Sequence, residues 1–173
     1  LMDVLKKKDG REIVYVYPGN EYRTLVESGN YTGQLIKESM EQGHLQPGFL
    51  TDAIVANILI TSLTPEKNLI ADGYPRETTQ SVSFEKMLEF YKRENIKIIY
   101  IEVGKEEAMK RNLLRGRVDD TKEGIEKRFD EYINKVVPAM NYFKDKIGYT
   151  IYTINGEQSV ENVHKDIIKA LEF

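Results

Sequence analysis

Cysteine is absent from the 173 residues of this chain, and histidine occurs only twice. Without cysteine the chain has no disulfides, no thiolate metal sites and no thiol nucleophile. The two histidines, His44 and His164, lie far apart and in no metal-ligand spacing, so we expect them to be ordinary surface or core residues. The lack of cysteine also fits a reducing compartment, and we expect a cytoplasmic protein.

The chain also lacks an apolar run long enough to span a bilayer, and it carries no signal peptide. Its formal net charge is −3, which gives no basic excess for binding nucleic acid or a membrane surface. Hydrophobic residues make up 40% and charged residues 31% of a length that suits one domain. We therefore expect a soluble globular domain whose partners are neither nucleic acid nor membrane.

The first ten residues have the pattern of a helix end. An apolar start is followed by lysines at 6–8 and by Gly10, and cations and a glycine are typical of the last turn of a helix. Neither an N-cap residue nor an initiating Met precedes them. We therefore expect further residues upstream of Leu1.

Apolar runs rich in β-branched and aromatic residues alternate with segments of helical periodicity. Strands are predicted at 13–17, 69–72, 96–103 and 149–154. Helices are predicted at 21–27, 32–42, 49–62, 78–94, 105–114, 120–135, 139–146 and from 160 onward. Local signals at their ends are a turn at Pro18-Gly19-Asn20, a cap at Asp120, a break or kink at Pro138 and a cap at Ser159. This alternation predicts an α/β fold with a parallel sheet covered on both faces, and strand 96–103 is apolar enough to be buried on both faces.

The stretch from Leu69 to Gln80 joins a strand to a helix with chemically distinctive residues. A short apolar run ends in Asp72, Gly73 allows a sharp turn, and Arg76 precedes the helix. Ligands of open α/β sheets bind beyond the carboxyl ends of the strands. There a carboxylate can hold hydrated Mg²⁺, an arginine can bind phosphate with two parallel bonds, and a glutamine can bond to a base edge. The stretch predicts a nucleotide site, with a plain strand–turn–helix corner as the alternative.

Arginines gather in residues 111–128. They are Arg111, Arg115, Arg117 and Arg128. The first two are four residues apart and share one face of a helix. The positive charges of these arginines repel one another unless anions lie between them. Two aspartates or a polyphosphate would supply such anions. A solvated, locally paired surface is the alternative, but lysine would serve such a surface equally well, so the arginines favour a phosphate site.

Several of these segments, in the same order along the chain, resemble the adenylate kinases and the wider family of nucleoside monophosphate kinases. Asp-Gly-Tyr-Pro-Arg-x-x-x-Gln at 72–80 matches the family's signature. Residues 19–23 resemble the Ser-Thr-Gly-Asp-x-x-Arg element of its monophosphate site, and Gly-His-Leu-Gln-Pro at 43–47 resembles its Gly-x-Leu-Val-Pro turn. The arginines of 111–128 match the lid and its flanks, and Ile-Asn-Gly at 154–156 resembles the loop around the ATP adenine.

The resemblance implies a fold and a reaction. The fold would be a P-loop-kinase-like, three-layer α/β/α arrangement with a parallel sheet. Residues 1–173 would form a single kinase domain, with a small helical monophosphate-binding insertion at 18–62 and a very short lid at 115–121. The reaction would transfer the γ-phosphoryl group of ATP to AMP, with Mg²⁺, and give two ADP. The resemblance also implies a monomer.

The resemblance further implies roles for individual residues. The monophosphate site would contain Pro18, Gly19, Arg23, His44, Leu45, Gln46, Gly73, Arg76, Gln80, Arg117 and Arg128. The ATP site would contain Arg111, Arg115 and Gln158. The catalytic arginines would be Arg76, Arg115, Arg117 and Arg128. Asp72 would hold Mg²⁺ through a water molecule, Gln80 would bond to the adenine, and Arg23 and Arg76 would hold the AMP phosphate.

Three departures from the family pattern affect these expectations. First, the chain has no Gly-x-x-x-x-Gly-Lys-Ser/Thr; its one Gly-Lys, at 104–105, lacks the leading glycine and the hydroxyl. We expect this P-loop and the family's first strand upstream of Leu1, since without that strand two buried strands would face an empty slot. Residues 1–173 alone should bind ATP poorly and should not catalyse turnover.

Second, Pro18 replaces the family's usual Thr. Third, only one residue separates Arg115 from Arg117, and a cysteine-bound zinc lid is absent.

Two other functions fit the same residues. One is a kinase of the UMP/CMP type, because Pro18 lacks the hydroxyl that would contact adenine. The other is a non-catalytic nucleotide-binding relative that lacks the P-loop. An unrelated α/β scaffold is the remaining alternative, and it leaves the order of the matching segments unexplained.

Overall fold

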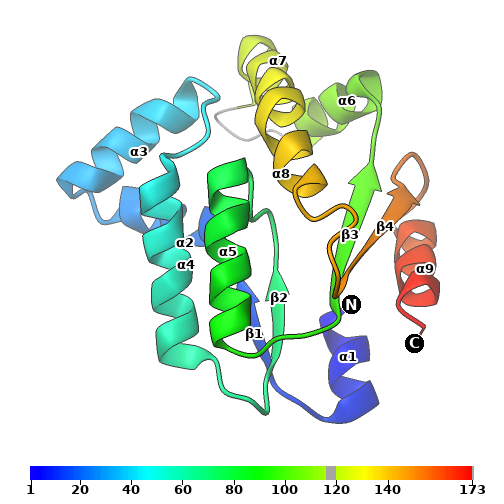
Figure 1. Cartoon of the computed structure of the whole chain (residues 1–173). Helices are drawn as coiled ribbons and strands as arrows, with labels where there is room; N and C mark the ends of the chain where they lie inside the picture. Colours follow the sequence, from blue (N-terminus) through cyan, green and yellow to red (C-terminus); the bar gives the residue numbers. More distant parts are fainter. Residues whose placement is uncertain (116–119, 173) are drawn as a thin grey trace.

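Strands and helices alternate along the chain, as the sequence predicts (Figure 1). This computed structural model describes residues 1–115 and 120–172. Its strands are β1 (Ile13–Val16), β2 (Asn68–Ala71), β3 (Ile96–Glu102) and β4 (Tyr149–Asn155). Its α-helices are α1 (Met2–Asp9), α2 (Pro18–Glu27), α3 (Tyr31–Glu41), α4 (Gly48–Ser62), α5 (Thr78–Phe90), α6 (Lys105–Arg115), α7 (Lys122–Glu131), α8 (Val137–Asn141) and α9 (Val160–Ala170). A π-helical segment, Tyr132–Val136, joins α7 to α8.

The described strands form two parallel pairs. β1 pairs with β2, from Ile13 opposite Asn68 to Val16 opposite Ala71. β3 pairs with β4 along seven residues of each strand. Parallel pairing requires a long crossover between partners, and α2, α3 and α4 provide it for the first pair. The parallel α/β fold predicted from the sequence is confirmed.

The two pairs are separate sheets rather than one. Among the described residues, β2 bonds to β1 and β3 to β4, and Figure 1 shows β2 and β3 as the inner members of the two pairs. The prediction that β3 is buried on both faces is wrong for this structure. None of its residues is fully buried, and Ile101 is 46% exposed. Within the described residues β3 also has a strand neighbour on one side only, and the core cluster on its pair, formed with α9, has three buried residues.

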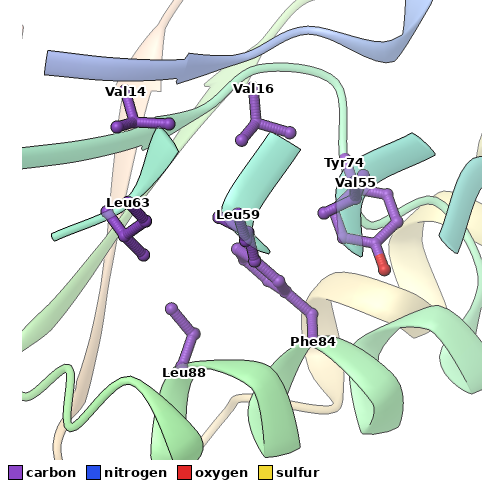
Figure 2. Close-up of a cluster of buried hydrophobic side chains, with 8 residues drawn as sticks. All are labelled: Val14, Val16, Val55, Leu59, Leu63, Tyr74, Phe84 and Leu88. Atoms are coloured by element: carbon purple, nitrogen blue, oxygen red, sulfur yellow. The ribbon is translucent and has the colours of Figure 1, made fainter. Parts of the chain in front are cut away.

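The main hydrophobic core lies between the first strand pair and the helices α4 and α5. Figure 2 shows its buried side chains, which are Val14, Val16, Val55, Leu59, Leu63, Tyr74, Phe84 and Leu88. Tyr74 belongs to the corner after β2, and its ring meets Phe84 of α5 edge to face at 5.1 Å between centroids. Its hydroxyl donates to Asp52 of α4 at 2.8 Å. This buried tyrosine therefore ties the corner to both covering helices.

A second core joins α9 to the second strand pair. Ile167 and Leu171 pack on Ile154 of β4, and Leu1 lies against the same cluster. Ser159 caps α9 by accepting a hydrogen bond from the Asn162 amide at 3.3 Å, so that prediction is confirmed. Within the part of the chain that the structure describes, no helix combines the length and the apolarity needed to cross a membrane.

Two local predictions are corrected by the structure, and a third is made specific. Pro18-Gly19-Asn20 is not a separate turn but the first turn of α2, because proline at the first helical position has no amide to leave unpaired. Asp120 does not cap α7; Thr121 does, accepting from the Gly124 amide at 3.0 Å. At the break or kink predicted for Pro138, α7 ends at Glu131, the chain becomes π-helical over Tyr132–Val136, and Pro138 falls in the first turn of α8.

The core position of Leu59 gives a first prediction. Leu59 is 1% exposed between β1 and α5, so Leu59→Ala should lower the free energy of unfolding by about 2–5 kcal/mol in urea denaturation. Ile60, the next residue of α4, is 74% exposed, and Ile60→Ala should change stability by less than about 1 kcal/mol. Equal losses in the two variants would contradict the placement of this core.

Candidate active site

The carboxyl ends of β1 and β2 meet at one edge of their sheet. Val16 lies opposite Ala71, and the Asp72 amide donates to the Val16 carbonyl at 2.8 Å, which extends the pairing by one residue. β1 is followed by α2, and β2 is followed by the corner at 72–77. Because the strands are parallel and in this register, the first turn of α2 and the corner lie side by side.

Asp72 is exposed beyond the end of β2 and is bonded to a tyrosine of β1. The Tyr15 hydroxyl donates to Asp72 Oδ2 at 2.5 Å. This bond and burial raise the pKa of Tyr15 to about 12, so the phenol stays neutral and keeps its proton for Asp72. The bond restrains the carboxylate through Oδ2 and leaves Oδ1 outside this contact.

Gly73 determines where the guanidinium of Arg76 lies. Gly73 has a φ of +65°, a region that favours glycine. Arg76 Nε donates to the Gly73 carbonyl at 2.7 Å, and a Cβ at Gly73 would stand 2.6 Å from Arg76 Nη2. A side chain at this position would displace the arginine as well as strain the backbone.

Gln80 lies in the first turn of α5, as predicted, and is 2% exposed. Its Oε1 accepts a hydrogen bond from the Arg76 amide at 2.8 Å. Because the carboxamide oxygen is engaged there, the amide nitrogen is the group that Gln80 can offer to a ligand.

One cavity of about 430 Å³ joins the corner, the first turn of α2, the loop between α3 and α4, and the helices α6 and α7. It brings together the predicted monophosphate residues Pro18, Gly19, Arg23, His44, Leu45, Gln46, Gly73, Arg76, Gln80 and Arg128. Arg115 lines the same cavity. Arg117, and with it residues 116–119 of the predicted lid, lies outside the described residues.

Arg115 and Arg128 are held by a single buried carboxylate. Arg115 donates to both oxygens of Asp120, at 3.0 and 2.7 Å, and Arg128 donates to Oδ1 at 2.7 Å. The Asp120 side chain is 1% exposed. Two guanidinium groups share one carboxylate, so this part of the cavity wall attracts an anion.

Arg111 and Gln158, predicted for ATP, lie apart from this cavity around the loop after β4. Arg111 donates to Glu107 at 2.6 Å and to the Gly156 carbonyl at 2.7 Å. Gln158 donates to the Asn155 carbonyl and to Asp166, at 2.9 and 2.6 Å. The structure thus places both residues beside the loop at 154–156 and leaves Arg115 as the predicted ATP residue that lines the cavity.

Contacts between α7 and the loop after α3 close one side of the cavity. Gly43 (φ +74°) packs so closely that a Cβ there would stand 2.7 Å from the Gly124 carbonyl oxygen. His44 Nδ1 lies 3.6 Å from Glu131, which pairs with Lys135 at 2.9 Å. Burial raises the pKa of Glu131, but its contacts with Lys135 and His44 outweigh burial and lower it below the usual value. Glu131 therefore stays ionised and binds the loop to α7.

The residues present fit a magnesium ion held mainly by a nucleotide. The part of the chain that the structure describes has no group of three or more histidine or carboxylate side chains that could hold a metal alone. Mg²⁺ in nucleotide sites needs only one or two carboxylates, since phosphates and waters supply its other ligands. Asp72, exposed and oriented by Tyr15, meets that requirement.

Sequence reasoning missed the hydroxyl-bearing residues of this region, among them Tyr15, Tyr22 and Thr51. Tyr22 and Thr51 line the cavity and are bonded to each other, and Tyr15 orients Asp72. The alternation of β1 gave a signal for Tyr15, because it places this side chain on the face opposite Val14 and Val16. Thr51 gave a weaker signal, as a polar residue on the inward face of an apolar helix.

A parallel α/β fold with an arginine-lined cavity beyond its strand ends defines a class, the nucleotide phosphotransferases. A family model described as adenylate kinase matches residues 6–148. Adenylate kinase isoenzyme 1 of Bos taurus is 31% identical over 158 residues, which cover 89% of this chain and 78% of that protein. The adenylate kinase of Rickettsia akari (strain Hartford) is 26% identical over 194 residues, covering 94% of this chain and 88% of that protein.

The chain therefore belongs to the adenylate kinase family. It is a phosphotransferase enzyme with the activity class of the nucleoside monophosphate kinases and the P-loop-kinase-like α/β fold of that family.

The shared carboxylate gives a second prediction. Asp120→Asn should leave Arg115 and Arg128 repelling each other, and should lower the free energy of unfolding by about 1–3 kcal/mol in urea denaturation. Glu126→Gln on the exposed side of α7 is the matched control and should change stability by less than about 0.5 kcal/mol. Identical stabilities for Asp120→Asn and wild type would show that the carboxylate does not hold the two arginines.

Proposed function

We propose that this enzyme transfers the γ-phosphoryl group of ATP to AMP and so forms two ADP. The observation that carries the proposal is the single cavity that combines Arg23, Arg76, Arg115 and Arg128 with the buried amide of Gln80. A phosphate dianion needs cations with fixed geometry, and a base needs a hydrogen-bonding group at a set distance from them. The cavity offers both kinds of group to one ligand.

AMP would lie against the corner after β2 and the insertion at 18–62. Arg23 stacks on the Tyr17 ring with 5.3 Å between guanidinium carbon and ring centre, and Arg76 is fixed by the Gly73 carbonyl. These two arginines would hold the phosphate, and the amide nitrogen of Gln80 would donate to the adenine. Arginines already ordered by the protein lose little entropy when the phosphate binds.

Catalysis would depend on alignment and charge, because phosphoryl transfer requires no covalent step from the protein. Arg115 and Arg128, together with Arg117, would meet the equatorial oxygens of the transferring group. Their common anchor on Asp120 supports this role, since donors fixed before the reaction cost no reorganisation in the transition state. One arginine placed in this way can contribute roughly 10³–10⁵ in rate.

The ATP side of the site would use the region between α6 and the loop after β4. Arg111 would stack on the base, as its bond to the Gly156 carbonyl places it beside that loop, and the main chain at Gln158 would meet the adenine. Asp72 would hold a water on Mg²⁺, and the ion would supply charge neutralisation of the phosphates. Residues 1–173 contain no Gly-x-x-x-x-Gly-Lys-Ser/Thr loop for the donor phosphates.

Water has to be excluded, because otherwise ATP would be hydrolysed. The insertion at 18–62 and the lid at 115–121 are the segments we propose to close on the substrates. The close approach of Gly43 to Gly124 supports this, since it joins the insertion directly to α7 beside the catalytic arginines.

A kinase of the UMP/CMP type is the second candidate. It is favoured by Pro18, which lines the cavity where the family usually has Thr and offers neither a hydroxyl nor an amide proton. A scan of the four nucleoside monophosphates distinguishes the two candidates.

The reaction gives a third prediction. The protein at its natural length should form ADP from ATP and AMP in a coupled assay that requires Mg²⁺. Residues 1–173 alone should show little turnover, because they carry no donor-phosphate loop. Absence of turnover with AMP, UMP, CMP and GMP in the protein at its natural length would refute the proposed kinase.

The corner arginine gives a fourth prediction. Arg76→Lys cannot form two parallel bonds to a phosphate, so AMP affinity measured by calorimetry should fall about tenfold to a hundredfold. Arg11→Lys provides a control, because Arg11 is an exposed arginine whose ion-pair partner is Asp9 at 4.0 Å, at the opposite end of β1. If both variants bind AMP as the wild type does, Arg76 has no part in phosphate recognition.

A further inference from the structure

Tyr17 is the last residue before α2, and it lines the cavity described above together with Arg23. The guanidinium carbon of Arg23 lies over the Tyr17 ring, 5.3 Å from its centre. A cation within about 6 Å of the centre of an aromatic ring is attracted by the negative charge of the ring face. The ring is therefore an electrostatic partner of this arginine as well as an apolar neighbour.

Arg23 differs from the other arginines of the cavity in the kind of partner that holds it. Arg115 and Arg128 share the carboxylate of Asp120. Within residues 1–115 and 120–172, Arg23 has no carboxylate partner. Besides the ring, its Nη2 donates a long hydrogen bond to Asn20 Oδ1 at 3.5 Å. Both partners are neutral, so they do not offset the charge of Arg23.

The sequence of this segment shows where the difference arises. The related element reads Ser-Thr-Gly-Asp-x-x-Arg, and residues 17–23 here read Tyr-Pro-Gly-Asn-Glu-Tyr-Arg. A neutral amide stands at the position of the acid, three residues before the arginine. An aromatic ring stands at the position of the small hydroxyl side chain, six residues before it. The carboxylate is thus lost and a ring face is gained beside the same arginine.

Two contacts hold the Tyr17 ring in place. A Cβ at Gly19 would stand only 3.2 Å from Cε2 of the ring, so the ring lies directly against the main chain in the first turn of α2. The Tyr15 ring lies 5.9 Å away between centres, inclined by 31°. A ring that is itself restrained can restrain the guanidinium that lies over it.

We propose that Tyr17 is a positioning residue for phosphate recognition, because its ring holds Arg23 by the face of the guanidinium group. The inference rests on the proposed function, since it deepens the description of that same monophosphate site. The donors of a guanidinium lie in its plane, whereas stacking uses its face. A carboxylate partner would occupy these donors and offset the charge. A neutral ring does neither, so Arg23 keeps most of its donors and its full charge for the phosphate.

This role makes the effect of Tyr17 specific to the phosphate. Tyr17→Leu removes the ring face and keeps an apolar side chain, so AMP affinity should fall about threefold to thirtyfold. The affinity for adenosine, which has no phosphate, should stay within about twofold of the wild-type value. Tyr17→Phe keeps the ring face and should retain AMP affinity to within about twofold.

The test measures affinities by calorimetry in the protein at its natural length, with AMP and adenosine as ligands. It compares the wild type with Tyr17→Leu and Tyr17→Phe. Tyr31→Leu is the matched control, because Tyr31 begins α3 and is 74% exposed. Thermal unfolding shows whether each variant is folded. Tyr17→Ser, which restores the residue of the related element, is the second variant if Tyr17→Leu does not fold.

A double-mutant cycle with Arg23→Met identifies the residue through which the ring acts. If the ring acts through Arg23, Tyr17→Leu should weaken AMP in the wild-type background and cause no further loss in the Arg23→Met background. The control Tyr31→Leu should match the wild type with both ligands. These results together are the expected outcome.

The outcomes that would overturn the inference can be told apart from failure of the proposed function. If the wild type binds AMP and the Tyr17 variants that lack a ring bind it equally well, the ring has no part in recognition and the proposed function stands. The same holds if Tyr17→Leu weakens AMP and adenosine by one factor, if Tyr17→Phe loses as much as Tyr17→Leu, or if the loss persists with Arg23→Met. If the wild type binds none of the nucleoside monophosphates, the proposed function itself fails and the inference fails with it.

Discussion

The parallel register between β1 and β2 is the constraint on which the site depends. Because Val16 lies opposite Ala71, two segments more than fifty residues apart leave the sheet at one point. The first turn of α2 then stands beside the corner after β2, and a shift of one residue would turn Asp72 away from Tyr15. The core between β1, α4 and α5 stabilises this register, and Tyr74 extends that core into the corner itself.

Around this junction, the protein's own contacts hold the charged and amide side chains in place without a ligand. Gly73 holds the guanidinium of Arg76, Asp120 holds Arg115 and Arg128, and the amide of Arg76 orients Gln80. Each of these contacts restricts the motion of a side chain in the free protein. The binding groups therefore need little reordering when an anionic ligand enters, which is how a small fold can combine affinity with geometric selectivity.

The helices, the strands and the corner could be predicted from short-range sequence patterns. The hydrogen-bond partners of individual side chains could not. The turn chemistry at 72–76 and the helix start at Thr78 depend on neighbours in sequence, so residue types were enough. Asp120 had the local pattern of a helix cap, but two arginines, one of them eight residues away, bind it more strongly, and Thr121 takes the cap. The bond between Tyr22 and Thr51 joins two helices, and no local pattern indicates such a partner.

The contact between Gly43 and Gly124 has a consequence for the dimensions of the site. Here two segments of main chain touch with no side chain between them, so their separation is the smallest that the backbone permits. The loop after α3 and the helix α7 close one side of the cavity, and this contact sets how near they lie to each other. A larger residue at Gly43 would push the loop away from α7, so this glycine limits the size of the molecule that fits.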